Sequence, residues 1–161
     1  MSLILGIDPG SERSGYAVVD GCAQILSSGD VENVDLRKLL LRWHSTYPLE
    51  TSSPVVAIEA LQSYGMAVGK SVFETAMWIG RFSEVAESLG MTVKLYARPK
   101  VFRAITGMAK GGDAALRRAL LLRFGGDKKG EPLNALKGST DKRSAFAVAI
   151  YHLDGARLGE W

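Results

Sequence analysis

The sequence predicts an α/β protein in which a mixed five-stranded sheet carries helices on both faces. Two observations predict this class. The first half of the chain is rich in hairpin signals, and the second half alternates short apolar strands with segments of helical length. No internal repeat, low-complexity tract or linker divides the 161 residues, so residues 1–161 are expected to form a single domain.

The first strands are predicted by apolar runs and a turn signal. Residues 3–8 (LILGID) form a short apolar run that Pro9-Gly10 stops, as expected of a buried strand. Asp20-Gly21 is a two-residue hairpin signal, and it joins a strand at 16–19 to another at 23–26.

The middle of the chain is expected to form a helix, a strand and a second helix. Residues 36–43 (LRKLLLRW) form a helix with Asp35 as its N-cap. Residues 54–58 (PVVAI) are continuously apolar, as in a strand buried on both faces. Residues 72–89 form a long helix with Gly90 at its C-cap position.

The last third of the chain contains one more strand and is otherwise helical. A fifth strand is expected at 91–96. Helices follow near 99–105 and 113–124, and a last helix runs from about 140 to 153. Residues 125–138, which lie between the last two helices, are expected to form a mobile loop.

Composition limits the classes of protein. Hydrophobic residues make up 47% and charged residues 23%, as in an ordinary globular protein. No stretch approaches the roughly 18 uninterrupted apolar residues of a membrane-spanning helix, and the N-terminus lacks the basic region of a signal peptide. With one cysteine, Cys22, an internal disulfide and a cysteine-cluster zinc site are excluded. We therefore expect a cytoplasmic protein without a membrane partner.

Charge is unevenly distributed, although the net charge is only +3. Residues 1–93 hold 6 Lys and Arg against 11 Asp and Glu, a net charge of −5. Residues 94–143 hold 13 against 4, a net charge of +9. An acidic part followed by a basic part fits a polyanionic partner that is bound with the help of metal ions. The basic stretch fits a solvated helical face equally well.

Two apolar strands each end on an acidic residue, Asp8 and Glu59. Neighbouring strand ends lie about 5 Å apart, so both carboxylates could point into one crevice. Carboxylates that close repel each other unless a cation separates them. Two Mg²⁺ ions roughly 4 Å apart would do so and would also activate water for attack on a phosphodiester. The alternatives are a turn-forming Asp8 and a Glu59 that begins a helix.

Four segments of the chain match one family in order and spacing. Gly6-Ile7-Asp8-Pro9-Gly10, followed by Gly15-Tyr16, resembles the first motif of RuvC-type Holliday-junction resolvases, which belong to the ribonuclease H-like superfamily. Ala57-Ile58-Glu59 is similar to the second acidic motif of that family. The segment 98–107 resembles the region before its DNA-binding helices, and 144–149 resembles its last helix. The chain looks like a divergent, phage-like member.

The resemblance implies a homodimer that binds four-way DNA junctions and nicks two strands symmetrically, without a small-molecule substrate. It also implies that each active site binds two Mg²⁺ ions, for which Mn²⁺ can substitute. Asp8 and Glu59 match the first two metal-binding positions of the family, and Asp141 matches the third. Ser144 stands where family members carry an aspartate.

Ser144 is a departure from the family pattern. The spacing from Asp141 keeps both residues on one helix face, but a neutral hydroxyl is a much weaker ligand for Mg²⁺ than a carboxylate. Three interpretations of Ser144 are open. The three acids suffice for metal binding, or the chain is an impaired form, or metal binding is lost while junction binding remains. We favour the first. Asp141 by itself also fits an acid in the first turn of a helix that Ser139 or Thr140 caps.

Basic residues in the second half are expected to contact DNA phosphates. They are Lys100, Arg103, Lys110, Arg117, Arg118, Lys142 and Arg143. The last two could equally face water. Tyr64 could stack on an unpaired base at the crossover or pack in the core. An apolar arc on the helix at 72–89 fits core packing or a contact between subunits: it consists of Phe73, Met77, Trp78 and Phe82.

Three rival functions remain. A nuclease of the same fold could act on RNA–DNA hybrids or on a broader range of branched DNA, although the basic helices at 98–124 favour branched DNA. A junction-binding protein without catalysis is the second rival, because of Ser144. An actin-like ATPase opens with a similar glycine-rich turn, but it needs two such halves, for which 161 residues leave no room.

Overall fold

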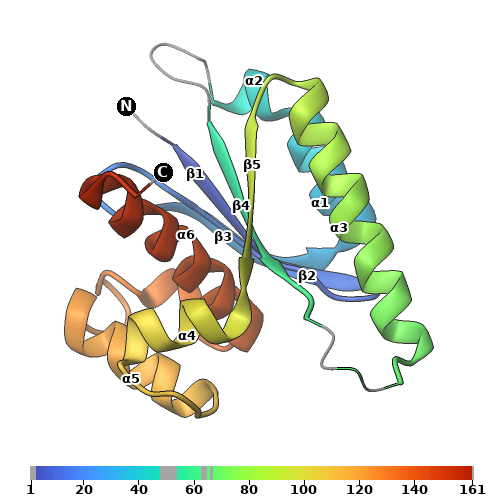
Figure 1. Ribbon diagram of the computed structural model, residues 1–161. Coiled ribbons are helices and arrows are strands. Elements are labelled where there is room, and N and C mark those ends of the chain that lie inside the picture. Colours follow the sequence, from blue (N-terminus) through green and yellow to red (C-terminus); the bar gives the residue numbers. More distant parts are fainter. Residues whose placement is uncertain (1–2, 48–53, 63–64, 66, 161) are drawn as a thin grey trace.

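Five strands form one mixed sheet in the computed structural model, which describes residues 3–47, 54–62, 65 and 67–160 (Figure 1). The strands are β1 (Ile4–Asp8), β2 (Arg13–Val19), β3 (Ile25–Glu32), β4 (Val55–Ala60) and β5 (Thr92–Ala97), and their order is β3-β2-β1-β4-β5. The pairs β1–β2 and β2–β3 are antiparallel, whereas β1–β4 and β4–β5 are parallel. The predicted mixed five-stranded sheet is confirmed.

Helices cover both faces of this sheet, as predicted (Figure 1). They are α1 (Asn33–Leu41), α2 (Trp43–Thr46), α3 (Lys70–Ser88), α4 (Arg98–Thr106), α5 (Asp113–Phe124), the 3-10 helix η1 (Asn134–Leu136) and α6 (Thr140–Leu158). On one face α1 and α3 pack together over the sheet, and on the other α6 lies along β1 and β2 with α4 and α5 beside it.

Side-chain alternation directs the two strand acids to the α6 face. In β1, Leu5 and Ile7 belong to the core beneath α1 and α3, so Asp8 points the other way. In β4, Ile58 belongs to that same core, and Glu59 therefore also points toward α6. The register pairs Ile7 with Ile58, so the next residues, Asp8 and Glu59, are neighbours at the carboxyl ends of two parallel strands.

Glycines in the sheet let α6 lie directly on it. A Cβ on Gly6 would overlap the carbonyl oxygen of Ala145, and a Cβ on Gly15 would overlap the backbone of Asp141. The α6 residues that face the sheet are correspondingly small, and Ala145 and Ala149 are fully buried. The backbone of α6 is therefore held close to the strands that carry the acids.

The turn after β2 differs from the predicted two-residue hairpin. The loop runs through Gln24, because the Asp20 carboxylate accepts hydrogen bonds from the backbone amides of Cys22 and Gln24, both at 2.8 Å. An aspartate side chain that bonds the backbone two residues ahead organises a longer turn than the dipeptide suggests. The strand predicted at 23–26 consequently begins at Ile25 and extends to Glu32.

Two helix ends also differ from the predictions. α1 begins at Asn33, so Asp35 lies in its first turn and Glu32 occupies the N-cap position. α3 ends at Ser88 with Leu89 as its C-cap, and Gly90 stands one residue further with φ 77°. A left-handed residue directly after the cap is a common way to end a helix, which explains why glycine is found there.

The segment expected to be a mobile loop is anchored to the core. Within residues 125–138, Leu133 and Leu136 are buried in the cluster that includes α6. The carbonyl oxygen of Ala135 also accepts a hydrogen bond from Ser28 Oγ of β3 at 3.0 Å. Across the part of the chain that the structure describes, no helix is both long enough and apolar enough to cross a membrane.

Candidate active site

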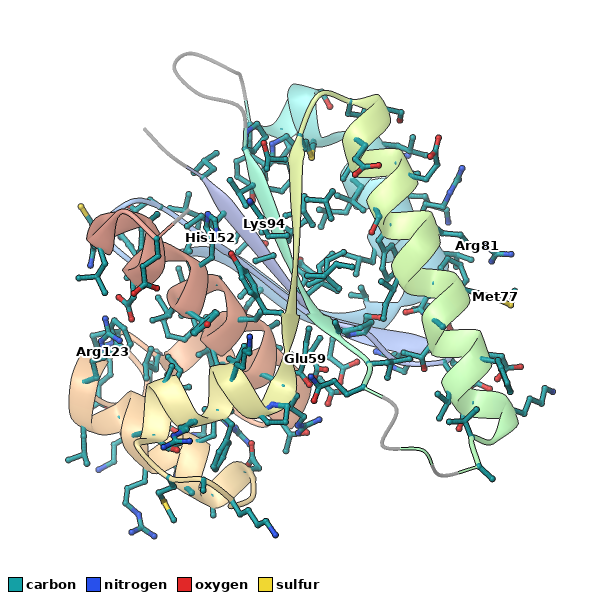
Figure 2. All side chains as sticks on the ribbon, in the orientation of Figure 1. Glu59, Met77, Arg81, Lys94, Arg123 and His152 are labelled. Carbon is teal, nitrogen blue, oxygen red and sulfur yellow. The ribbon has the colours of Figure 1, made fainter. Side chains whose placement is uncertain are left out.

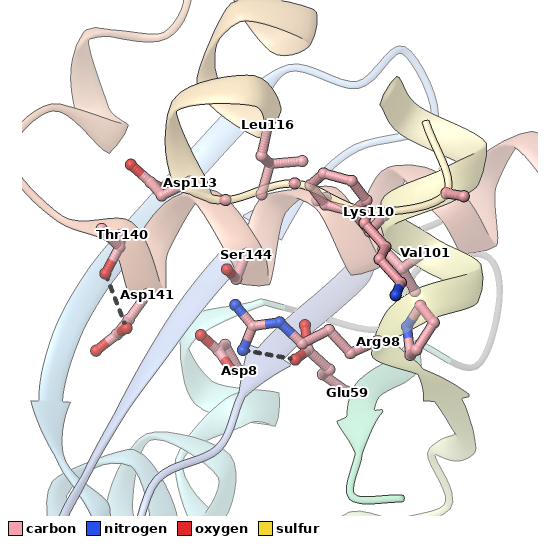
Figure 3. Close-up of a pocket in the computed structure, with 16 residues that line it drawn as sticks. Asp8, Glu59, Arg98, Val101, Lys110, Asp113, Leu116, Thr140, Asp141 and Ser144 are labelled. Atoms are coloured by element: carbon pink, nitrogen blue, oxygen red, sulfur yellow. Dashed lines mark hydrogen bonds and ion pairs between the residues drawn. The ribbon is translucent and has the colours of Figure 1, made fainter. Parts of the chain in front are cut away.

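The predicted metal-binding residues line one pocket (Figure 3). Asp8 is the last residue of β1, and Glu59 lies near the end of β4. Asp141 and Ser144 come from the first turns of α6. All four line a cavity of about 270 Å³, whose other walls are α4, the loop that follows it and the start of α5. Folding thus brings together residues that lie far apart in the sequence.

A buried hydrogen-bond network holds the loop after Asp8. The backbone amide of Gly10 donates to Ser14 Oγ at 3.2 Å, and Ser14 Oγ donates to Asn33 Oδ1 at 2.5 Å. Asn33 Nδ2 then donates to the carbonyl oxygen of Gly10 at 2.9 Å. The loop that leaves β1 is therefore tied to β2 and α1, which fixes the point from which Asp8 projects. Ser14 and Asn33 were not identified from the sequence.

The start of α6 is fixed by its cap. Ser139 Oγ accepts a hydrogen bond from the backbone amide of Lys142 at 3.2 Å, which agrees with the cap allowed by the sequence. Asp141 follows in the first turn, where Thr140 Oγ1 donates to its carboxylate at 3.2 Å. Ser144 is 5% exposed and lines the pocket together with Asp8, where its hydroxyl lowers the pKa of the Asp8 carboxyl. Ser144 therefore lies beside a predicted metal ligand.

Burial and mutual repulsion raise the pKa values of the two strand acids. The pKa of Asp8 rises to about 8, because burial disfavours its charged form and the charges of Glu59 and Asp141 add to the effect. Burial also raises the pKa of Glu59, an effect that the nearby Arg98 opposes. Acids perturbed in this way inside a cleft are typical of functional sites.

A guanidinium stands beside these acids. Arg98, the first residue of α4, places Nη1 3.3 Å from Glu59 Oε1 (Figure 3). Figure 2 shows Glu59 where the end of β4 meets the start of α4. Sequence reasoning included Arg98 in a motif without giving it a role. One signal could have identified Arg98. It directly follows β5, and β5 is the neighbour of β4, which carries Glu59 near its end.

The donor set fits a divalent cation by its chemistry. Carboxylate oxygens are the ligands that Mg²⁺ prefers, and four carboxylates line this pocket. Asp113 is paired with Arg143, which leaves Asp8, Glu59 and Asp141 as the candidate ligands. Among the residues that the structure describes, no group of three or more His, Cys, Asp or Glu side chains is close enough to hold a metal ion in this conformation. Burial and the neighbouring carboxylates favour the neutral form of Asp8 in the ion-free protein, and a bound cation would favour its ionised form.

Four of the predicted DNA-binding cations are exposed beside the pocket. Lys100 and Arg103 project from α4, Lys110 from the loop before α5, and Arg118 from α5. Lys110 also lines the pocket (Figure 3). The acidic cleft therefore has a basic rim, as the uneven charge distribution suggested.

The other three predicted cations make contacts within the chain. Arg117 pairs with Asp127 at 2.7 Å, and Lys142 Nζ donates to the carbonyl oxygen of Ala135 at 2.7 Å. Arg143 is 12% exposed and binds both carboxylate oxygens of Asp113 at 3.0 and 2.8 Å, which links α6 to α5. These contacts give each residue a structural role, and DNA contact by them remains a prediction. Tyr64 lies outside the described residues.

Comparisons with known proteins agree on one family. Residues 4–152 match the family model "Crossover junction endodeoxyribonuclease RuvC". The protein of that name from Anaeromyxobacter dehalogenans (strain 2CP-1) is 30% identical over 168 residues, which cover 94% of this chain and 80% of the relative. The one from Magnetococcus marinus is 24% identical over 163 residues, which cover 94% and 83%.

Solved structures show the same fold. Thermus thermophilus RuvC superposes with a TM-score of 0.72 at 20% identity, over 98% of this chain and 96% of the other. The structure of T. thermophilus RuvC in complex with a Holliday junction substrate gives a TM-score of 0.73 at 19% identity, with the same coverage. The sheet order, the helices on both faces and the acidic cleft thus define a ribonuclease H-like α/β protein, as expected. The chain belongs to the crossover junction endodeoxyribonuclease RuvC family.

Proposed function

We propose that this chain is a Holliday-junction resolvase, in which residues 1–161 form one domain that nicks four-way DNA junctions by metal-dependent hydrolysis of phosphodiester bonds. The observation that carries the proposal is the pocket lined by Asp8, Glu59 and Asp141, in a chain whose family is named for cleaving crossover junctions. The Thermus thermophilus relative has been solved in complex with a Holliday junction substrate, which supports the choice of substrate.

The proposed cofactor is Mg²⁺, for which Mn²⁺ can substitute, at two ions in each site. Asp8, Glu59 and Asp141 are the residues that would hold them. When bound, such ions supply an activated water and a counter-charge for the leaving oxygen of an in-line displacement. In this proposal Ser144 is a positioning residue, because its hydroxyl lies beside the Asp8 carboxylate and favours its ionised form.

The chain's own groups have two tasks in this proposal. Asp8 must release its carboxyl proton to become a ligand, and a pKa of about 8 in the ion-free protein means that cation binding and proton release occur together. Lys110, at the rim of the pocket, is suited to the phosphate nearest the cut. The exposed Lys100, Arg103 and Arg118 then bind flanking phosphates and position the junction by its backbone.

Symmetric nicking also calls for a homodimer, because two active sites at a fixed separation follow from twofold symmetry. The outer side of α3 supports this part of the proposal. Phe73 and Met77 are 61% and 55% exposed there, and Figure 2 shows Met77 and Arg81 on the side of α3 that faces away from the sheet. Phe82 of the same helix is fully buried and belongs to the core.

The experiment is cleavage of labelled four-way junction, duplex, flap and RNA–DNA hybrid substrates, with and without Mg²⁺. We expect paired nicks in the junction that require the cation. Asp8→Asn should abolish cleavage and spare junction binding, since it removes a metal ligand without altering the basic rim. Asp154→Asn is the matched control, because Asp154 lies in α6 but pairs with Arg123 away from the pocket. Unchanged cleavage by Asp8→Asn would overturn the proposal.

A junction-binding protein without catalysis is the second candidate. It is favoured by the hydroxyl of Ser144 at a position where the family resemblance leads one to expect a carboxylate. A titration of Mg²⁺ and Mn²⁺ against a labelled four-way junction separates the two functions. Tight binding without cuts at any cation concentration supports this second candidate and excludes the nuclease.

A further inference from the structure

The Arg98 side chain is a loosely held cation at the carboxylate pocket. Its Nη1 lies 3.3 Å from Glu59 Oε1, and its side chain is 67% exposed, whereas that of Glu59 is 9% exposed. Arg98 also lines both cavities that contain Asp8 and Glu59. The exposed guanidinium loses little when it leaves this ion pair, whereas the buried Glu59 carboxylate needs another cation in its place.

Two other arginines of the chain are held differently. Arg143 donates two hydrogen bonds to Asp113, at 3.0 and 2.8 Å, and Arg123 donates two to Asp154, both at 2.7 Å. Such two-bond pairs fix the plane of the guanidinium as well as its position. The contact between Arg98 and Glu59 is longer than these bonds, so it places a charge near the carboxylate without fixing the side chain.

The charge of Arg98 acts on the predicted metal ligands. It lowers the pKa of Glu59 and also that of Asp8, against the burial that raises both. Arg98 therefore offsets part of the negative charge of the pocket, which is the task of a bound cation. A guanidinium and a divalent cation that both need the Glu59 carboxylate repel each other, so they compete for it.

We propose that Arg98 is a displaceable counter-charge, which pairs with Glu59 in the ion-free protein and turns to a DNA phosphate when a divalent cation takes that carboxylate. This inference rests on the proposed function. Arg98 is well placed for the exchange, because it begins α4, whose exposed Lys100 and Arg103 belong to the basic rim. An arginine suits this task, since its guanidinium pairs equally well with carboxylates and phosphates.

The exchange couples the two ligands of the site. A cation that binds Glu59 frees Arg98 for the DNA, and a phosphate that binds Arg98 frees Glu59 for the cation. Because coupling between two binding equilibria is reciprocal, each ligand must raise the affinity for the other by the same factor. Cutting would then depend on both being present, which limits hydrolysis to DNA that is fully seated.

The first test measures Mn²⁺ affinity without DNA, by titration calorimetry or by the electron paramagnetic resonance signal of the free ion. Arg98→Gln should bind Mn²⁺ roughly threefold to tenfold more tightly than the wild type, because a competing surface cation is lost. Arg98→Lys keeps the charge and should stay close to the wild type. Arg103→Gln is the matched control for Mn²⁺ affinity, since it removes the same charge from α4 at a residue that does not line the pocket.

The second test measures binding of a four-way junction in Ca²⁺ and in chelator, with cleavage checked on the same samples. Arg98→Gln should weaken junction binding more in Ca²⁺ than in chelator, since Arg98 is free to reach a phosphate only when a cation holds Glu59. An equal loss under both conditions contradicts the exchange and leaves Arg98 as an ordinary phosphate contact.

The outcomes separate this inference from the proposed function. If the wild type binds no Mn²⁺ and the junction is not cut, the proposed function fails and the inference fails with it. If the wild type binds Mn²⁺ but Arg98→Gln binds it no more tightly, the role of Arg98 is overturned and the proposed nuclease stands.

Discussion

The two faces of the sheet are packed in different ways. On the face covered by α1 and α3, large side chains fill the space, and Leu36, Trp43 and Phe82 are fully buried there. On the face covered by α6, helix and sheet meet almost backbone to backbone, because Gly6 and Gly15 leave no room for a Cβ. The α6 face also buries large side chains, Phe146 and Ile150 among them, and it adds this direct contact between main chains.

The difference explains why the candidate site lies on the α6 face. Large side chains can repack and allow a helix to shift slightly, whereas a helix in direct contact with strand backbone has little freedom to move. Catalytic groups must keep their mutual geometry, and here they come from strands and a helix that touch. A substitution that adds atoms on the α6 face should therefore mainly lower the cleavage rate. A substitution that removes atoms on the α3 face should mainly lower the free energy of unfolding.

Among the changes that test how the two faces are packed, the largest effect is expected for Gly15→Ala. The added methyl group would overlap the backbone of Asp141, so the start of α6 must move away from β2, the strand that contains Gly15. A displacement of about 1 Å in a catalytic group can lower a rate about 100-fold, and we expect a loss of that order in single-turnover junction cleavage. Junction binding should change little, because the exposed cations are elsewhere. Cleavage within threefold of the wild type would show that α6 is not held as tightly as the packing indicates.

The next effect is a pH dependence that belongs to the α6 face. In the ion-free protein the pKa of Asp8 is about 8, against 3.8 for the free side chain. A raised acid pKa means that ionisation opposes folding, so stability falls as pH rises from about 4 to about 8 and is level above that. The slope should reach about 1 kcal/mol per pH unit, measured by denaturant unfolding in chelator.

Asp8→Asn is the control for this slope. It removes the ionisation of Asp8, so its unfolding free energy should change less between pH 5 and pH 8 than that of the wild type. Added Mg²⁺ should also flatten the wild-type profile, because a bound cation favours the ionised carboxylate. Parallel profiles for the wild type and Asp8→Asn in chelator would show that Asp8 is not the buried acid described.

A smaller effect on cleavage is expected for Ser144→Asp, and its sign is opposite to that of Gly15→Ala. A carboxylate in place of the hydroxyl adds a fourth candidate ligand to Asp8, Glu59 and Asp141 and should preserve or raise cleavage, most clearly at limiting Mg²⁺. Without metal the same change should lower stability, because a buried charge is added beside Asp8. Cleavage as a function of Mg²⁺ concentration, with unfolding in chelator, measures both. A loss of cleavage at saturating Mg²⁺ would mean that the Ser144 hydroxyl beside Asp8 matters more than a further ligand.

The smallest effect on cleavage is expected for Phe82→Leu on the opposite face. The substitution leaves a small void in the core beneath α3 and should lower the free energy of unfolding by about 1–2 kcal/mol. Specific cleavage activity at a temperature where the protein is folded should match the wild type, because Phe82 and the buried residues of α6 belong to separate core clusters on opposite faces of the sheet. A cleavage defect as large as that of Gly15→Ala would remove the distinction between the two faces.

Local signals in the sequence were sufficient for the strand acids. Asp8 and Glu59 each follow a short apolar run, and side-chain alternation then fixes the face to which they point. Asp141 and Ser144 were grouped correctly because residues three apart share a helix face, and Ser139 was a recognisable cap. In each case the residues of a single helix or strand determine the direction in which the side chain points.

Features that depend on contacts between distant segments were missed. Ser14 and Asn33 hold the loop after Asp8, yet neither carries a motif, and their pairing depends on how β2 meets α1. Arg98 reaches Glu59 only because β4 and β5 are neighbours in the sheet. The length of the turn at Asp20 was predicted wrongly, because the Asp20 side chain bonds backbone amides and so organises a longer turn than a two-residue hairpin. Sequence periodicity carries no information of these kinds.

The central claim is that Asp8, Glu59 and Asp141 together bind divalent cations. Anomalous diffraction from crystals grown with Mn²⁺ tests it most directly. We predict anomalous peaks in the pocket, in contact with carboxylate oxygens of all three residues, and Arg98 turned away from Glu59. An empty pocket at saturating Mn²⁺, or peaks confined to other acidic residues, would contradict the claim.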